Sequence, residues 1–191
     1  MISICDVAEL ISGTPQFRIA EDLSGSAPAY FFYSQSDLED DLRQVSRQDV
    51  ARKQIRTFNE VITTSVGDVV FSLLSGKAVI VQKEHDGLLL TQNYVRLVPL
   101  DALNADYLVY LLNEDQNIRH QLRVSQQGSI TMKYTLKQLR ELRFPALPSL
   151  EKQRLIGEIY LNQLKLDTLR KRAAELETAL VLGKIKEAVQ L

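Results

Sequence analysis

The hydrophobic pattern of the chain changes near residue 99, from a pattern typical of strands to one typical of helices. Between residues 59 and 99, short segments rich in Val, Ile, Leu or Thr alternate with glycine-containing pairs, as in strands joined by turns. Strands are therefore predicted at 61–64, 69–73, 78–82, 88–91 and 94–98. The pair Asp86-Gly87 has the composition of a two-residue hairpin turn. A further short, buried strand is predicted at Tyr30–Tyr33.

Two short helices are predicted in the first quarter of the chain. Apolar residues between Val7 and Ile11 have helical spacing, and Gly13 follows as a stop signal. Ser36 and Glu39 have the spacing of a capping box, which predicts a turn of helix through Leu42.

Helices are predicted throughout the second half. Apolar residues between 107 and 112 share one face of a helix that Asn104 would cap. Further helices are predicted around 118–123 and after Thr135. Two prolines exclude a regular helix or a central strand over 144–148, because proline lacks the backbone donor.

The last part of the chain predicts one long helix. Ser149 can cap it, and no proline follows. A repeat of 3.5 residues, typical of coiled coils, places these residues on one seam: Ile159, Asn162, Leu166, Leu169, Ala173, Leu176, Leu180 and Gly183. Such a helix would be roughly 50–60 Å long, too long for the preceding domain to cover. We therefore expect pairing with a helix of another chain; the alternative is a helix folded back on its own domain and broken near Gly183.

These patterns predict an α+β fold, with a mixed, β-rich domain over 1–148 and a long C-terminal coiled-coil helix over 149–191. The 191 residues are 45% hydrophobic and 25% charged, which is ordinary for a soluble globular protein and excludes a collagen or a disordered chain. No run is long enough to span a membrane, and no signal peptide is apparent. Cys5 is the single cysteine, which fits the reducing cytoplasm.

The formal net charge of −1 hides two basic segments. Residues 43–57 contain five bases and one acid, and residues 118–154 contain eight bases and two acids. A phosphate backbone responds to the local field, so such segments can bind nucleic acid in a chain that is acidic overall. The alternative is an unevenly charged, solvated surface.

No active site is visible in the sequence. The spacing of Gly67 and Gly76 does not fit a Walker loop, and no G-x-G-x-x-G occurs. His85 and His120 lack a second ligand at metal-binding spacing and are interpreted as surface histidines. Cys5 is interpreted as a small core residue of the first helix, and the acids of 37–41 as a solvated face.

The order of these features resembles a known family. The matching residues are Asp6–Pro15, Gly67–Ser72 with Gly76, Thr91–Tyr94, Tyr107-Leu108, and Gly128–Ile130 followed by Phe144–Ile156. The chain resembles one half of the specificity (S) subunit of type I restriction–modification enzymes, with one target recognition domain and one spacer helix. A usual S subunit has two of each in tandem, so the single copy suggests a half-length form that dimerises or joins a larger assembly. The tryptophan often found ahead of the family's first helix is absent.

The resemblance implies a non-catalytic role. One recognition domain would read one half of a bipartite target in double-stranded DNA. The long helix would pair in a homodimer, set the spacing between two domains and dock methyltransferase (M) subunits, and possibly restriction (R) subunits. The family's S-adenosylmethionine, Mg²⁺ and ATP would bind those partner subunits, so no cofactor is expected on this chain. Two-fold pairing of identical chains would require an interrupted palindrome as target.

Side-chain chemistry suggests which residues contact DNA. Arg and Lys suit guanine, and Asn and Gln suit adenine. Loop residues with these groups are Arg18, Lys77, Gln92, Asn93, Gln126 and Gln127. Phosphate contacts are expected from Ser129, Thr131, Lys133 and Arg140.

Two other functions remain open from the sequence. One is a nuclease or methyltransferase fragment with a dispersed active site. The other is a coiled-coil dimeric DNA-binding regulator, or a scaffold, outside restriction–modification.

Overall fold

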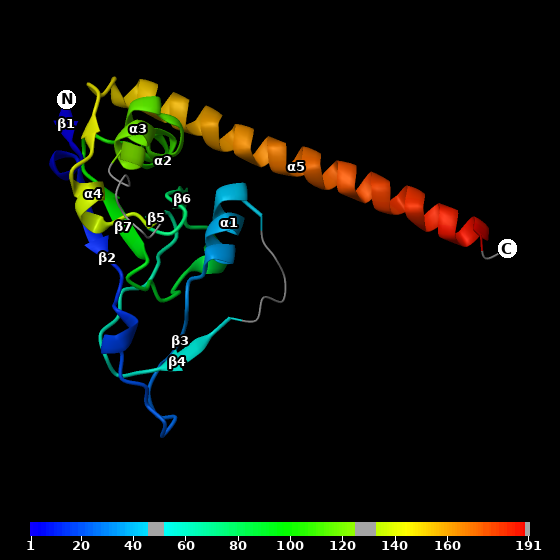
Figure 1. Ribbon diagram of the computed structural model, residues 1–191, viewed down its shortest axis with the longest axis horizontal. Coiled ribbons are helices and arrows are strands. Elements are labelled where there is room, and N and C mark those ends of the chain that lie inside the picture. The colour runs from blue at the N-terminus through cyan, green and yellow to red at the C-terminus, as the bar shows by residue number, and fades with distance from the viewer. Residues whose placement is uncertain (46–51, 125–132, 190–191) are drawn as a thin grey trace.

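The centre of the molecule is a four-stranded antiparallel sheet (Figure 1). The computed structural model describes residues 1–45, 52–124 and 133–189. In sheet order the strands are β2 (Ala8–Ser12), β7 (Tyr94–Pro99), β5 (Val69–Ser72) and β6 (Ala78–Ile80). Two smaller antiparallel pairs flank the sheet: β1 (Ile2–Ser3) with β8 (Arg143–Phe144), and β3 (Ala29–Phe31) with β4 (Gln54–Arg56).

Helices cover the sheet and extend beyond it. The α-helices are α1 (Gln35–Arg43), α2 (Ala105–Glu114), α3 (Gln116–Val124), α4 (Leu136–Arg140) and α5 (Leu150–Val189). Short 3-10 helices are η1 (Ile4–Asp6), η2 (Gln16–Arg18) and η3 (Lys83–His85). Figure 1 shows α5 as a single rod that starts on the domain and projects far from it. The α+β class and the long C-terminal helix are confirmed.

The core lies on both faces of the sheet, because β5 is buried throughout. Val69 and Phe71 belong to an apolar cluster that includes residues of α2 and α3. Val70 points to the opposite face, into a cluster with Tyr33 and with Leu38 of α1. This alternation follows from the two-residue period of a strand.

The predicted helix over 7–11 is wrong, because this segment forms β2 and pairs with β7 along its whole length. Its apolar residues fit an edge strand as well as a helix, and the pairing partner decides between them. Gly13 is not a helix stop. It lies against the backbone of Leu90 and Thr91, where a Cβ atom would collide.

Several predicted strands are shorter or less regular than expected. Residues 61–64 and 88–91 form isolated bridges, such as Thr63 with Leu89, and no strand. The strand predicted at 30–33 is β3, which ends at Phe31 and is partly exposed. Asp86-Gly87 is a turn, with Gly87 at φ 72°, but it does not join two paired strands.

The helix predictions after residue 99 are confirmed, with caps formed by Asn104 and Thr135. The capping box of α1 consists of Ser34 and Asp37, two residues earlier than predicted. Helix α5 runs without a break past Gly183, so the broken-helix alternative is wrong. Over the described ranges, no helix is both long and apolar enough to cross a membrane.

Candidate nucleic-acid interface

Three loops meet at one end of the central sheet. The strand register aligns Ser12, Val95, Phe71 and Ala78 in a row across β2, β7, β5 and β6. Because neighbouring strands are antiparallel, the segments just beyond this row lie at the same end of the sheet. These segments are residues 13–18, 73–77 and 91–94.

Backbone hydrogen bonds join these loops to one another. The Gly13 N–H donates to the Tyr94 carbonyl at 3.0 Å, and the Leu73 N–H donates to the Asn93 carbonyl at 2.8 Å. The Tyr134 N–H in turn donates to the Leu73 carbonyl at 2.8 Å, which adds residues 133–134. We call residues 13–18, 73–77, 91–94 and 133–134 the loop edge.

A glycine and an arginine fix the turn at 73–77. Gly76 has φ 65° and lies against the Tyr134 ring, so a side chain at this position would collide with the ring. The Arg119 guanidinium donates to the Gly76 carbonyl at 2.6 Å. The turn therefore has a defined position relative to α3.

Five of the ten predicted DNA contacts lie in the loop edge: Arg18, Lys77, Gln92, Asn93 and Lys133. Gln126, Gln127, Ser129 and Thr131 lie outside the described residues. Arg140 lies elsewhere. It ends α4, and its carbonyl accepts from the Cys5 thiol of η1 at 3.7 Å, away from the loop edge.

These side chains differ in what they already bind. The Gln92 amide oxygen accepts from the Gln16 N–H at 2.8 Å, so this residue also holds η2 in place. The Lys77 ammonium lies 3.8 Å from the Glu114 carboxylate in a partly exposed ion pair, which leaves it able to meet an anion. Lys133 is exposed.

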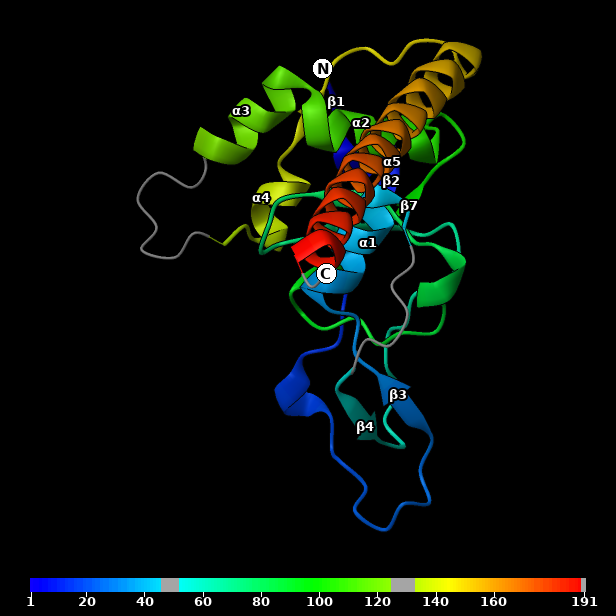
Figure 2. The same ribbon diagram turned by 90° about the vertical axis from the view of Figure 1, so that its right-hand side faces the viewer.

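The first basic segment belongs mainly to a projecting arm formed by β3, β4 and the loop before β3 (Figure 2). The Arg56 guanidinium donates to the Ala27 carbonyl at 3.0 Å, and the Arg52 guanidinium is paired with Asp37 at 2.9 Å. In the loop before β3, hydrogen bonds from the Ser24 hydroxyl and from the Ala27 N–H lower the pKa of Asp22 to about 2. Part of this segment's charge thus stabilises the arm itself.

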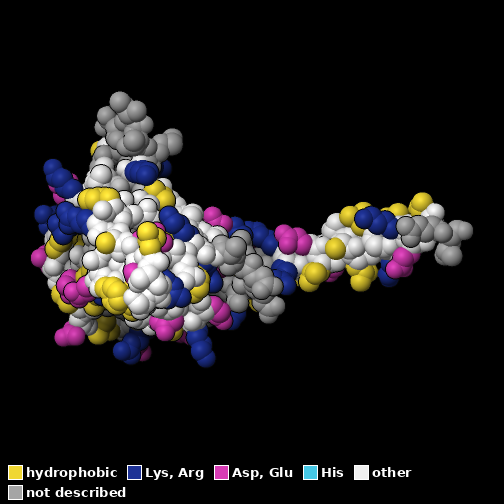
Figure 3. Space-filling model, turned by 90° about the horizontal axis from the view of Figure 1, so that it is seen from below, with side chains coloured by type: hydrophobic (Ala, Val, Ile, Leu, Met, Phe, Trp, Pro, Cys, Tyr) yellow, Lys and Arg dark blue, Asp and Glu magenta, His cyan; other side chains and the backbone are white. Residues whose placement is uncertain are grey.

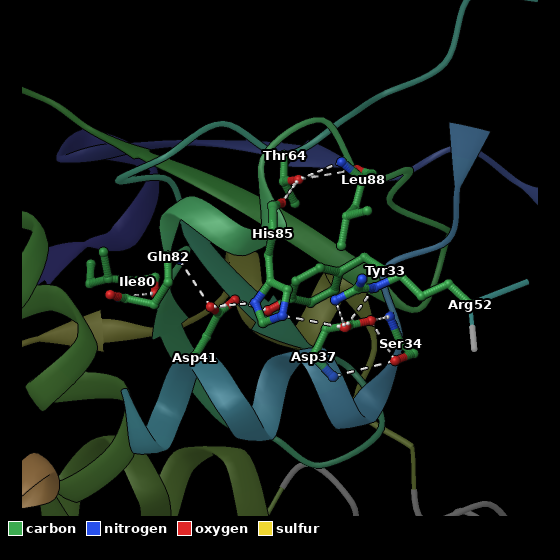
Figure 4. Close-up of polar contacts among 10 residues, drawn as sticks. All are labelled: Tyr33, Ser34, Asp37, Asp41, Arg52, Thr64, Ile80, Gln82, His85 and Leu88. Carbon is green, nitrogen blue, oxygen red and sulfur yellow. Dashed lines mark hydrogen bonds and ion pairs between the residues drawn. The ribbon is translucent and has the colours of Figure 1, made fainter. Parts of the chain in front are cut away.

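A buried charged network, which the sequence analysis did not predict, lies at the base of the arm (Figure 4). His85 is only 2% exposed, and Asp37 and Asp41 are also buried. The interpretations of His85 as a surface residue and of 37–41 as a solvated face are therefore wrong. His85 Nδ1 lies 2.7 Å from Asp41 Oδ1, and His85 Nε2 lies 3.4 Å from Asp37 Oδ1.

The network connects four separate segments. The Tyr33 hydroxyl, just after β3, donates to Asp41 at 2.6 Å, and Arg52, just before β4, donates twice to Asp37. Burial disfavours a charge on His85, but the hydrogen bond to Asp41 and the two carboxylate charges raise the pKa of its imidazole. The network thus fastens both strands of the arm to α1. Burial, together with the charge of Asp41, also raises the pKa of Tyr33.

Cys5 is exposed on η1 and is not a core residue, which corrects the interpretation from the sequence. Its side chain is on the surface because η1 is a single turn whose Ile4 takes the buried position. His120 is exposed, as predicted.

The first turns of α5 pack closely on α2. The buried Gln153 side chain accepts from the Asn104 N–H at 2.9 Å and donates to the carbonyls of Ala102 and Pro148. One turn later, Gly157 lies so close to α2 that a Cβ atom would be 2.5 Å from Asp106 Cβ. Tyr160 follows on the same face and donates to Glu114 at 3.0 Å.

The predicted seam lies on the opposite side of α5. At about 3.6 residues per turn, the seam projects roughly half a turn away from the stripe of Gln153, Gly157 and Tyr160. The leucines and isoleucine of the seam are 41% to 60% exposed: Ile159, Leu166, Leu169, Leu176 and Leu180. Asn162 and Ala173 are exposed as well.

Comparison with known proteins identifies the family. The model described as the type I restriction modification DNA specificity domain matches residues 1–178. The HsdS subunit from Thermoanaerobacter tengcongensis has a similar structure, with 21% identity and a TM-score of 0.60 over 98% of this chain and 42% of that chain.

Two further solved structures are similar. The first concerns the structural basis of complex assembly and conformational transition of the type I R-M system. It has 21% identity and a TM-score of 0.62, over 98% of this chain and 43% of that chain. The type I restriction-modification S subunit from M. genitalium has 14% identity and a TM-score of 0.50, over 95% and 41% of the two chains. Curated protein sequences give no match. The chain thus spans less than half the length of these structures, and at such identities they show the fold. Because the family model covers most of its length, the chain belongs to the type I restriction–modification DNA specificity family.

Proposed function

We propose that this chain recognises one half of a bipartite DNA target through the loop edge. The observation that carries the proposal is the convergence of Arg18, Lys77, Asn93 and Lys133 at one end of the sheet, in a chain of the DNA specificity family. Hydrogen bonds between the loop backbones fix the positions from which these side chains extend, and such side chains can select among base edges. In this proposal residues 1–148 form the recognition domain, and 149–191 form the spacer helix.

The chain has no catalytic step of its own in this proposal. Methyl transfer and DNA cleavage belong to M and R subunits, which would bind S-adenosylmethionine, Mg²⁺ and ATP. Gln126, Gln127, Ser129 and Thr131 are retained as candidate DNA contacts, whereas Arg140, which lies away from the loop edge, is not. Because these partners act on cellular DNA, the expected location is the cytoplasm.

The spacer helix pairs with a second copy of the chain. The exposed seam supports this, because a row of leucines facing water over several turns is unfavourable and pairing buries it. The seam faces away from the chain's own domain, so a partner helix can approach it without a clash. The resulting two-fold dimer would carry two recognition domains and read an interrupted palindrome.

The outer part of α5 has a second apolar face, which supports docking of an M subunit. Leu182, Ile185 and Val189 are exposed and lie roughly half a turn from Leu180 of the seam. Figure 3 shows hydrophobic side chains along both sides of this part of the helix. Because one partner helix can cover only one of the two faces, the second face is available to another subunit.

Co-purification with the M subunit encoded nearest to this chain, followed by sequencing of the methylated DNA, tests the proposal. We expect a complex that methylates an interrupted palindrome. A methylated site with two unrelated halves would contradict the homodimer. A stable dimer that binds no M subunit and leads to no methylated site would favour a regulator or scaffold.

A further inference from the structure

A large hydrophobic side chain of the loop edge faces solvent. Phe17 is 81% exposed, although its backbone is held firmly. The Gln16 N–H is bonded to the Gln92 side chain, and the buried Ile19 donates to the Gln16 carbonyl at 3.1 Å. A rigid turn therefore presents an aromatic ring to solvent, where contact with a partner would bury apolar surface.

The charge beside the ring indicates the chemistry of that partner. The Arg18 guanidinium carbon lies 5.6 Å from the centre of the Phe17 ring, in a cation–π arrangement. A flat apolar ring next to a positive charge matches a ligand with flat apolar faces and neighbouring negative charges. A nucleic acid has both, in its bases and its phosphates.

We propose that Phe17 packs as a wedge against one base step of the duplex bound at the loop edge, with Arg18 on the adjacent phosphate. This inference rests on the function proposed above and adds an indirect component to it. A wedge partly unstacks the step that it touches, so it favours steps that deform easily, such as pyrimidine–purine steps. Phe17 would thereby contribute to specificity without a hydrogen bond to any base.

Selection and fluorescence together test the wedge. The full chain is used to select duplexes from a pool with a randomised centre, and 2-aminopurine is then placed at successive positions of the selected duplex. With the wild-type chain, we expect fluorescence to rise at one position and a pyrimidine–purine step to be enriched there. The Phe17→Ala variant should lose this rise and bind roughly tenfold more weakly, within the range of base–aromatic stacking. Phe17→Leu should bind with intermediate affinity.

Phe58 provides the matched control, because it is a second phenylalanine, 73% exposed, which lies just after β4 and outside the loop edge. Phe58→Ala should leave both affinity and fluorescence unchanged. A Phe17→Ala variant with the affinity and the 2-aminopurine fluorescence of the wild type would overturn the wedge, while the proposed function would stand. A variant that keeps DNA binding but no longer captures the M subunit would instead place Phe17 in a protein interface. If the wild-type chain selects no duplex at all, the proposed function fails, and the wedge fails with it.

Discussion

His85 and Asp41 are in direct contact in the buried network, with 2.7 Å between Nδ1 and Oδ1. Asp41 belongs to α1 and His85 to η3, so this contact joins a helix to the loop that follows β6. The Gln82 N–H donates to the same carboxylate oxygen at 2.9 Å, and the Tyr33 hydroxyl donates to the other. The Asp41 carboxylate is thus the point where three segments meet.

Replacement of Asp41 by Asn should destabilise the domain strongly. The amide removes the negative charge from beside His85, and breaking a buried pair costs about 3–5 kcal/mol of unfolding free energy. Urea unfolding followed by circular dichroism measures this loss. The partly exposed Glu39, 3.9 Å from Arg43 on the same helix, provides the control. Glu39→Gln should change the free energy by less than about 1 kcal/mol. Equal effects of the two substitutions would contradict the structural role of the network.

Stability should also fall as the pH rises, because the folded state raises the pKa of His85. A group whose pKa is raised by folding stabilises the folded state fully at pH values below its unfolded pKa of about 6.5. This stabilisation is lost as the pH rises through the pKa that the group has in the folded state. Burial and the charge of Arg52 lower the pKa of the imidazole, but the hydrogen bond to Asp41 and the charges of Asp41 and Asp37 outweigh them. Tyr33 also faces the ring and donates to Asp41.

The slope of unfolding free energy against pH measures the effect. It should reach at most about 1.4 kcal/mol per pH unit for one proton. His85→Gln should abolish the fall in unfolding free energy above about pH 6.5. His120→Gln, at an exposed position, should retain this fall. A wild-type slope in both variants would assign the titration to other groups.

Elements with local signals were predicted well from the sequence. Helices α2 and α4 have side-chain caps within three residues of their start, and the period of α5 persists over many turns. Strand β2 was missed because its pairing with β7 joins residues as far apart as Ala8 and Pro99. Periodicity over five residues cannot report a partner at that distance.

The candidate site was predicted in part. Arg18, Lys77 and Asn93 were predicted as DNA contacts because they are polar residues at predicted loops. The strand register brings these loops together. The buried network could not be predicted, because His85 and Asp41 are distant in sequence and each has the composition of a surface position. The one available signal was the spacing of Asp37 and Asp41, which places two acids on the same face of α1 as the buried Leu38.

The Gln153 side chain should anchor α5 to the domain. Gln153→Leu leaves the Asn104 N–H and two carbonyls, all in part-buried bonds, without this partner; a fully buried group left unpaired costs about 1–3 kcal/mol. We expect a loss of at least about 2 kcal/mol in the free energy of unfolding, measured by urea denaturation. Gln163→Leu, at an exposed position of the same helix, should have little effect. Unchanged stability of the Gln153 variant would show that Gly157 and Tyr160 hold the helix without it.

Lys133 and Arg140 should differ in DNA binding, because only Lys133 lies in the loop edge. Lys133→Ala should weaken binding to all duplexes and lower the slope of log affinity against log salt by about one unit, as expected for one lost phosphate contact. Arg140→Ala should leave the slope unchanged. Fluorescence anisotropy over a salt series measures both. Equal losses would extend the DNA surface to α4, and two unchanged slopes would exclude the loop edge as the DNA-binding face.

Charges placed in the seam of α5 should separate the dimer. Leu169→Glu with Leu176→Glu puts two carboxylates into the apolar contact on each chain, where their desolvation is unfavourable. Sedimentation of the isolated chain should then show a monomer.

Lys171→Glu with Thr178→Glu provides the control, because these residues have the same seven-residue spacing and lie on the opposite side of the helix. This second variant should remain a dimer. If the seam variant also stays dimeric, the chains do not pair through the seam; if only the control becomes monomeric, pairing uses the opposite face. In both cases the half-site spacing could not be set by the seam.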